Sequence, residues 1–333
     1  MFKRSKQTGV SLIELLITLV IGTILMAGAM RVFQQSKNAY RVNESSSRLQ
    51  ENARFAMDTL DPDIRLSSNW GLTNVAEAID NRTGQPGALP AFGGDCALGF
   101  YTDVMNQNVL GLNGTPLIAG LNGTNAPLAG CIPGASYQPG TDVLVIRHAS
   151  ANPVVPTATG THLQSIRGAN SRLFSGNIVP AMGPASQTFR LLVHTFYVNP
   201  NSPTLGAGVP SLRRVRLADG PVMIDEEVIP GVEDFQFQFG IDTTGDLSAN
   251  RYINADNPMI TPGSGAFIPF SQIVSVRLWL RMRADRVELA FDGSTENYVY
   301  ADQNFTPPAN DGFRRLLVTK TVLLNNTRLR SAP

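Results

Sequence analysis

The chain has 333 residues, of which 43% are hydrophobic and 16% charged. This is enough apolar material for a sizeable core, and it excludes a globally disordered chain. The formal net charge is +1, so no overall field favours nucleic acid, and we expect no nucleic-acid partner. The 30 glycines and 22 prolines predict many turns and long loops rather than a helical bundle.

An apolar segment of membrane-spanning length stands close to the N-terminus. Residues 10–30 (VSLIELLITLVIGTILMAGAM) carry one charged side chain, Glu14, and are about as long as a helix needs to be to cross a bilayer. The residues before them include three basic side chains and no acidic one. The positive-inside rule then predicts a single-pass protein of the inner membrane, with residues 1–9 in the cytoplasm and the bulk in the periplasm.

Three interpretations of this segment compete. A secretory signal peptide would be cut near residues 27–29, where Ala-Gly-Ala supplies small side chains. A plain membrane anchor would let Glu14 reach the interface from the start of the helix. In the third interpretation Glu14 is functional, because an ionisable group inside a membrane is costly and usually has a partner.

The residues around Glu14 resemble the type IV prepilin (class III) signal. Gly9 is followed by Val-Ser-Leu-Ile-Glu, residues 10–14. The resemblance implies that a prepilin peptidase cleaves between Gly9 and Val10 and that Val10 is then N-methylated. It also implies that Glu14, the fifth mature residue, neutralises the N-terminal amine of a neighbouring subunit during filament assembly. Val10 departs from the more usual Phe at this position.

Elementary electrostatics agrees with that role for Glu14. An unpaired carboxylate in hydrocarbon costs several kcal/mol, and a charged amine at the same depth has the same problem. Placing the carboxylate of one subunit beside the amine of the next relieves both costs in a single axial register. We therefore expect Glu14 to set the register as well as to neutralise charge.

The helix is expected to continue beyond the membrane. Apolar residues recur at intervals of three and four, which predicts an amphipathic helix over residues 31–66. We expect Asp61-Pro62 to interrupt it, so that one helix runs from about residue 11 to about residue 60 and Pro62 begins a further short turn. The apolar stripe consists of Leu49, Ala53, Ala56, Leu60 and Ile64.

Residues 67–140 are predicted to be a loop-rich insertion that contains both cysteines, Cys96 and Cys131. Two cysteines are too few for a zinc site of their own. In an oxidising compartment they would form a disulfide, which contributes about 4 kcal/mol in the chain-entropy model. If the chain stays in the cytosol they are two separate thiols, so the choice depends on export.

Residues 141–333 are predicted to be a β-rich globular domain. Alternating apolar and polar residues indicate an antiparallel sheet with one covered face, and the amphipathic half of the helix is its natural cover. Asp219-Gly220 predicts the turn of a hairpin over residues 211–229. The other expected strands are 141–149, 187–198, 232–241, 271–283 and 314–326.

A second resemblance covers segments from both ends of the chain. Residues 49–65, 229–242, 273–283 and 314–330 are similar to the PilW-type minor pilins, relatives of the J-type pseudopilins. The resemblance implies an α+β, type IV pilin-like fold. In it, a long N-terminal helix with a hydrophobic first half and an amphipathic second half packs on an antiparallel β-sheet with long loops.

The same resemblance implies a minor pilin that helps initiate type IV pilus assembly and lies at or near the pilus tip, with a role in twitching motility. The implied partners are other minor pilins, the major pilin, the prepilin peptidase, the inner-membrane assembly platform and a PilY-type tip adhesin. After assembly the protein would lie in the pilus at the cell surface. Two alternatives remain: a minor pseudopilin of a type II secretion system, and a tip subunit for adhesion or binding.

No catalytic constellation is evident, and we expect no enzymatic activity. His148, His162 and His194 lie far apart in the sequence without a metal-binding or catalytic motif, which indicates structural or surface roles. Arg213, Arg214 and Arg216 could bind an anion but more often form a solvated face of a strand.

Calcium is the one cofactor that the sequence suggests. A candidate loop, DTTGDLSAN at residues 242–250, offers oxygen ligands at alternating positions and a glycine. Its candidate ligands are Asp242, Thr244, Asp246 and Asn250. The bidentate glutamate of a calcium loop is missing, because Ile253 stands at the twelfth position. The alternative is a polar turn between two strands.

Overall fold

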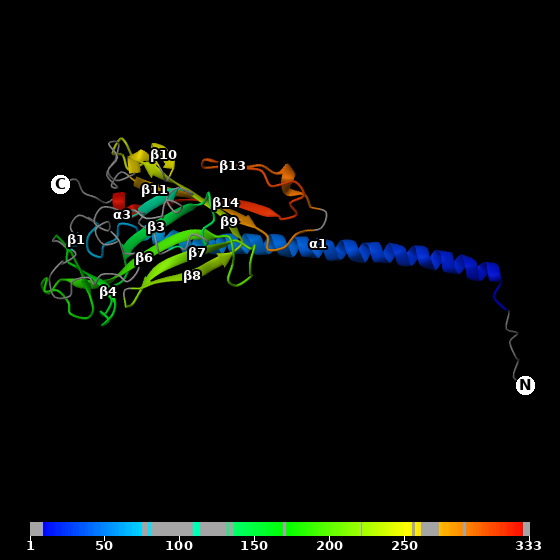
Figure 1. Ribbon diagram of the computed structural model, residues 1–333, viewed down its shortest axis with the longest axis horizontal. Coiled ribbons are helices and arrows are strands. Elements are labelled where there is room, and N and C mark those ends of the chain that lie inside the picture. The colour runs from blue at the N-terminus through cyan, green and yellow to red at the C-terminus, as the bar shows by residue number, and fades with distance from the viewer. Residues whose placement is uncertain are drawn as a thin grey trace, which may run out of the picture. The chain divides into compact units, whose positions relative to one another are not determined.

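The computed structural model describes residues 9–74, 79–80, 109–113, 132, 136–168, 171–220, 222–254, 257–260, 273–288 and 291–328. The chain divides into two units, residues 1–48 and 49–333, which are described separately. One long N-terminal helix and mainly antiparallel sheets make up most of the regular structure (Figure 1). The predicted α+β class is therefore confirmed.

Helix α1 runs without a break from Leu12 to Leu66, so the predicted interruption at Asp61-Pro62 is wrong. A proline in a helix interior removes one hydrogen bond and costs about 3 kcal/mol. Leu60 and Ile64, on either side of Pro62, are fully buried. The Asp61 carboxylate pairs with Arg65 at 2.6 Å and with Lys320 at 3.1 Å. Packing and pairing on both sides therefore hold the helix together through the proline.

In the described part of the chain, three sheets follow the helix. The first has eight strands in the order β1-β5-β4-β6-β3-β2, with β7 pairing with both β6 and β8. Its only parallel pair among the described strands is β1 with β5. Its strands are β1 (Ile79–Asp80), β2 (Val109–Asn113), β3 (Asp142–Ala149), β4 (Thr161–Ser165), β5 (Ser171–Ser175), β6 (Gln187–Asn199), β7 (Ser211–Ala218) and β8 (Val222–Pro230).

The second sheet has four strands in the order β10-β9-β11-β14, and the third pairs β12 with β13. Neighbouring strands of the four-stranded sheet are all antiparallel. The strands are β9 (Val232–Ile241), β10 (Arg251–Asn254), β11 (Ile273–Arg283), β12 (Tyr298–Tyr300), β13 (Gln303–Phe305) and β14 (Arg315–Leu323). Short helices η5 (Pro258–Ile260), η7 (Gly293–Thr295) and α3 (Asn325–Arg328) complete the described elements.

The main core lies where the last turns of α1 meet both large sheets. The predicted stripe of α1 is buried there, and Met57 joins it. The eight-stranded sheet contributes residues such as Leu144 and Phe196, and the four-stranded sheet contributes Phe237 and Leu278. In Figure 1 this part of α1 runs along the strands. The amphipathic half of the helix is thus the predicted cover, but for two sheets rather than one.

The central strands of the eight-stranded sheet are covered on both faces, which corrects the expectation of one covered face. All eight residues of β3 are buried. Leu144 and Ile146 point into the core with α1, whereas Val143 and Val145 belong to a second core. Trp70, Ile79, Ile132 and Tyr137 complete that second core, so the described residues of the segment 67–140 supply cover for the sheet. This cover could not be predicted from the sequence, because these four residues follow no period.

The strands predicted from alternation are present. The segment 232–241 is β9, and residues 273–283 of the predicted 271–283 are β11. The predicted hairpin consists of β7 and β8, paired from Ser211↔Pro230 to Ala218↔Val222. Gly220 has φ +83°, a conformation that the turn requires and that glycine adopts without strain.

Candidate functional site

The described part of the N-terminal segment begins with Gly9 and Val10, which precede the helix. The Ser11 carbonyl accepts hydrogen bonds from the backbone N–H groups of Glu14 at 3.0 Å and Leu15 at 3.1 Å, which starts the first turn. A Cβ on Gly9 would meet no atom within 4 Å, and Gly9 does not have a positive φ. Nothing in the described structure therefore requires glycine at this position.

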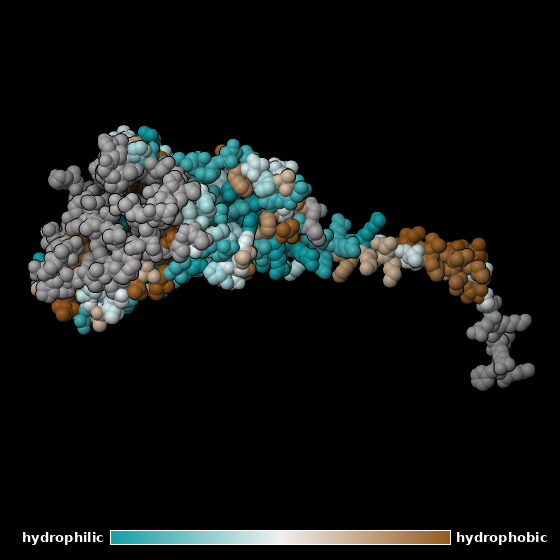
Figure 2. Space-filling model, viewed as in Figure 1, coloured by the Kyte–Doolittle hydropathy of each residue, from teal (hydrophilic) through white to brown (hydrophobic). Residues whose placement is uncertain are grey.

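The first half of α1 presents an apolar surface on all sides. An 18-residue window has a mean hydropathy of 2.3, and none of it is buried within the protein. Val10 is 71% exposed and Ile13 65%. Figure 2 shows a brown, hydrophobic region over the start of the helix. By length and composition this one helix could cross a membrane.

The polar groups of this apolar helix differ in whether they have a hydrogen-bond partner. The Thr18 hydroxyl donates to the Leu15 carbonyl at 2.9 Å, and the Thr23 hydroxyl donates to the Val20 carbonyl at 2.8 Å. Both hydroxyls are therefore satisfied within the helix itself. Glu14 is different, because within the described part of the chain its exposed carboxylate has no ion-pair or hydrogen-bond partner. A partner for Glu14 in lipid has to come from another molecule or from outside the described residues.

The calcium candidate forms a closed polar turn. Asp242 accepts the backbone N–H groups of Thr244, Gly245 and Leu247 at 2.7–3.0 Å. Although desolvation raises the pKa of Asp242, these N–H groups lower it to a value below the usual range. The Asn250 side-chain oxygen accepts the Thr243 N–H at 2.8 Å. This geometry favours the polar-turn interpretation over calcium binding.

The same arrangement extends to the third candidate ligand. Asp246 Oδ1 accepts the Ser248 N–H at 2.9 Å. Like Asp242, it turns an oxygen toward the backbone of its own loop.

The predicted cysteine pair, Cys96 and Cys131, lies outside the described residues.

The arginines of β7 are paired with acids of the neighbouring strand. Arg213 contacts Asp225 at 2.9 Å, and Glu226 contacts Arg214 at 2.5 Å and Arg216 at 3.1 Å. Each cation therefore has a carboxylate partner across the β7–β8 ladder. The geometry favours a surface of ion pairs over a site for an added anion.

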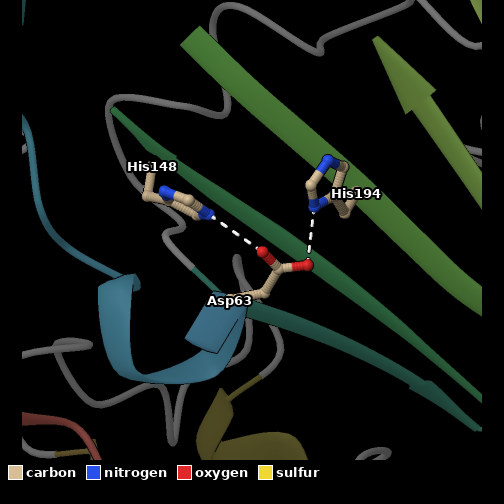
Figure 3. Close-up of side chains that lie close together, drawn as sticks. All are labelled: Asp63, His148 and His194. Carbon is tan, nitrogen blue, oxygen red and sulfur yellow. Dashed lines mark hydrogen bonds and ion pairs between the residues drawn. The ribbon is translucent and has the colours of Figure 1, made fainter. Parts of the chain in front are cut away.

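Two of the three histidines meet, although they lie far apart in the sequence. His148 on β3 and His194 on β6 point toward Asp63 near the end of α1 (Figure 3). His194 Nδ1 is 2.6 Å from Asp63 Oδ2, and His148 Nε2 is 3.5 Å from Asp63 Oδ1. Of the structural or surface roles expected for the histidines, burial favours the structural one for this pair. His162 lies apart on β4 and is stacked near Phe174.

Strand register explains the meeting. Ile146 of β3 is directly opposite His194 of β6, and His148 is two residues further along the same face. Leu144 and Ile146 show that this face of β3 packs against α1. Alternation along the two strands would have placed both histidines on the core face. The pairing register, which brings them to Asp63, could not be derived from the sequence.

The cluster is nearly closed to solvent. The exposed fraction is 1% for the His148 side chain, 11% for His194 and 13% for Asp63. Burial raises the pKa of Asp63, but the contacts with His148 and His194 outweigh it and hold the pKa far below its usual range. Asp63 is therefore ionised at neutral pH. The three groups could hold a metal ion, since one ligand atom from each lies within 4.8 Å of the others.

Comparisons with known proteins agree with both resemblances. Residues 195–326 match the family model described as type IV pilus-assembly protein W. Residues 4–30 match the prokaryotic N-terminal methylation motif. Among solved structures, a type IV-like pilin from Thermus thermophilus is similar at 17% identity, over 51% of this chain and 86% of that one, with a TM-score of 0.24. No curated protein matches the chain.

In two segments the chain is similar to type IV pilus-related proteins, and its exposed apolar helix has the length and composition of a membrane-anchoring segment. Within that class the β-rich region is similar to PilW, as the sequence predicted. Such proteins typically have structural rather than catalytic roles. Their place in pilus biogenesis implies contacts with other pilus components.

Proposed function

We propose that the chain is a minor pilin that helps initiate type IV pilus assembly and lies at or near the pilus tip. The observation that carries this proposal is the N-terminal helix. It exposes an apolar surface on all sides and carries one carboxylate, Glu14, five residues after Gly9. A helix that is apolar all round needs lipid or other helices around it. A filament core and a membrane both provide that surrounding.

Processing is proposed to occur between Gly9 and Val10, followed by methylation of Val10. Glycine is not required at position 9 by the described backbone, since a side chain would find open space there. A peptidase that recognises glycine would account for its presence at this position. Residues 1–9 would then be the leader, 10–30 the membrane and filament-core segment, and 31–66 its amphipathic continuation.

Glu14 is proposed to neutralise the N-terminal amine of a neighbouring subunit. Within the described residues its carboxylate has no partner, and an unpaired carboxylate in hydrocarbon costs several kcal/mol. The proposed partners are the other minor pilins, the major pilin and the assembly platform. Before assembly the bulk of the chain would be periplasmic, where Cys96 and Cys131 would form a disulfide.

The decisive experiment is N-terminal mass spectrometry of the mature protein. We expect a chain that starts at Val10 with one added methyl group. A mature chain that still begins at Met1, or one cut after Ala29, would contradict the proposal. It would favour a plain anchor in the first case and a signal peptide in the second.

The assembly role needs a second measurement. We expect Glu14→Gln to keep processing at Gly9 but to lower the amount of the subunit in sheared pili. Glu44→Gln, at an exposed position of the same helix, is the matched control and should assemble normally. Normal incorporation of Glu14→Gln would contradict the register role.

The nearest alternative is a minor pseudopilin of a type II secretion system, which would use the same processing and the same helix. A deletion separates the two, because a pilus role predicts loss of twitching motility and a secretion role predicts loss of exported enzymes. A further alternative, a tip subunit for adhesion, predicts that the full chain binds a surface through residues 67–140.

A further inference from the structure

The Asp63–His148–His194 cluster has the donor atoms of a metal site. Two imidazole nitrogens and one carboxylate oxygen are typical ligands of zinc, with bonds of about 2.0–2.2 Å. Two such ligands of a tetrahedral ion lie about 3.3 Å apart, and Asp63 Oδ1 lies 3.5 Å from His148 Nε2. The 2.6 Å contact between Asp63 Oδ2 and His194 Nδ1 is a hydrogen bond, so these two atoms have to separate by a fraction of an ångström to admit an ion.

His148 gives an independent indication. Its Nδ1 is 2.8 Å from the Ala149 carbonyl, which can only accept, so Nδ1 carries a proton. In the neutral ring Nε2 then holds a lone pair. Within the described part of the chain Nε2 has no hydrogen-bond partner, and it points at the Asp63 carboxylate from a buried position. In that neutral ring two electron-rich groups face one another, and either a second proton on Nε2 or a cation between them removes the conflict.

The surroundings of His148 also fit a ligand. Metal-bound histidines usually donate their other ring N–H to a carbonyl or carboxylate, which fixes the ring and its tautomer. The Ala149 carbonyl supplies that contact. The His194 ring is positioned by packing. It makes edge contacts with His148 at 6.3 Å and with Phe196 at 6.2 Å between centroids.

The position in the fold favours a cation. Asp63 lies three residues before the end of α1 at Leu66, and the C-terminus of a helix carries a partial negative charge. The Asp63 and His194 side chains each keep a small exposed fraction, through which an ion can enter the otherwise buried cluster from solvent. Three protein ligands leave a fourth position for water.

We propose that Asp63, His148 and His194 bind one divalent zinc ion that ties the end of α1 to β3 and β6. On binding, the proton on His194 Nδ1 leaves to solvent and Nε2 carries the one proton of the neutral ring, so that the Nδ1 lone pair coordinates the ion. The ion takes over the link that the hydrogen bond now makes, and it also engages Nε2 of His148. This site is independent of the assembly role proposed for the N-terminal helix.

The test uses the full chain in detergent, stripped with a chelator and then titrated with zinc alone. Calorimetry and metal analysis are expected to give one zinc per chain. Asp63→Asn and His194→Gln are each expected to weaken binding by about tenfold or more. His162→Gln is the matched control, because His162 is also buried but stands outside the cluster, and its zinc affinity should be unchanged.

Two further measurements guard against a false result. A Cys96→Ser, Cys131→Ser variant should still bind zinc, since the site contains no thiol. Zinc-edge X-ray absorption of the unmodified chain should show nitrogen and oxygen ligands and no sulfur, which tests the site even if a variant fails to fold.

Three results would overturn the proposal: no zinc uptake by the unmodified chain, sulfur among its ligands, or equal affinity in the cluster variants and His162→Gln. The first result would identify the cluster as a proton-linked group of ion pairs.

Discussion

Glu233 of β9 reaches across β11 to Arg315 of β14. The arginine donates to it twice, from Nε at 2.7 Å and from Nη2 at 3.0 Å. The strand register shifts between the Arg281↔Asp234 and Met282↔Val232 pairs, so Glu233 has no direct partner on β11. Such irregularities re-aim a side chain. Here the carboxylate links three strands, because Arg281 of β11 also donates to it at 3.0 Å.

The first prediction is that Glu233→Gln destabilises the fold by about 1.5 to 3 kcal/mol, since it removes charged hydrogen bonds to two buried guanidinium groups. Arg315 keeps its pair with Asp311 at 2.8 Å, and Arg281 keeps Asp234 at 3.6 Å. Urea unfolding of the full chain in detergent measures this. Glu226→Gln is the control, because Glu226 is 32% exposed, and exposed pairs contribute about 0–1 kcal/mol. Equal losses in the two variants would contradict the assignment.

The second prediction concerns pH. Burial raises the pKa of Glu233, but hydrogen bonds from Arg315 and the charge of Arg281 outweigh it and lower the pKa from its ordinary value of 4.5. Its contribution is therefore present above pH 4.5 and is lost as the pH falls through the lower folded value. The pKa of the neighbouring Asp234 is raised by burial, so that group acts in the opposite direction.

Comparison of two pH profiles isolates Glu233 from Asp234. The stability of the unmodified chain should fall more steeply below pH 4.5 than that of Glu233→Gln, because the variant lacks the titrating group. Parallel acid profiles for the two chains would show that Glu233 titrates normally.

The third prediction concerns the contact of α1 with both sheets. Leu60 is fully buried, whereas Leu205 is 48% exposed. Leu60→Ala should cost about 2 to 5 kcal/mol, because it removes apolar contacts and leaves a cavity. Leu205→Ala should change stability by about 0.5 kcal/mol or less. A small effect at Leu60 would mean that the helix end is not held by the core.

The fourth prediction concerns Pro62. Pro62→Ala should stabilise the chain by about 2 kcal/mol, since a restored helix bond gains about 3 kcal/mol and the freer unfolded chain costs about 1 kcal/mol. Thermal unfolding measures the change. Arg54→Ala, at an exposed position of the same helix, should have little effect. A less stable Pro62→Ala chain would show that the proline fits its site without cost.

The fifth prediction concerns the loop at Asp242. Calcium should leave the melting temperature unchanged, because the Asp242 and Asn250 oxygens already accept N–H groups of the loop. Asp242→Ala should lower the melting temperature in calcium-free buffer. A calcium-dependent rise in the unmodified chain, absent from Asp242→Ala, would instead establish a calcium site.

Periodic features of the fold could be predicted from the sequence. The three- and four-residue spacing of the apolar stripe, which includes Leu60 and Ile64, predicted the buried face of α1. Alternation predicted that Phe235 and Phe237 lie in the core. Pro62 was misjudged because local propensity does not include the packing on either side of it. The cover supplied by residues 67–140 was missed because side chains such as Trp70 follow no period.

The candidate site divides in the same way. The prepilin-like signal is a contiguous motif, so Gly9, Val10 and Glu14 could be named from the sequence, and their roles stay predictions. The histidine–aspartate cluster depends on three elements that meet only in the fold. His148 and His194 could have been assigned to the core face, but no pattern pointed from them to Asp63.

Asn326, near the end of the described chain, caps the C-terminal end of α1. Asn326 Nδ2 donates to the Arg65 carbonyl at 3.2 Å and to the Ser67 carbonyl at 3.1 Å, which are 261 and 259 positions earlier. Synthesis therefore delivers the anchor first and its closing contact last. A nascent chain can reach the membrane while the far end of its helix is still uncapped, and any chain that stops before Asn326 keeps the means of insertion without the contact that completes the fold.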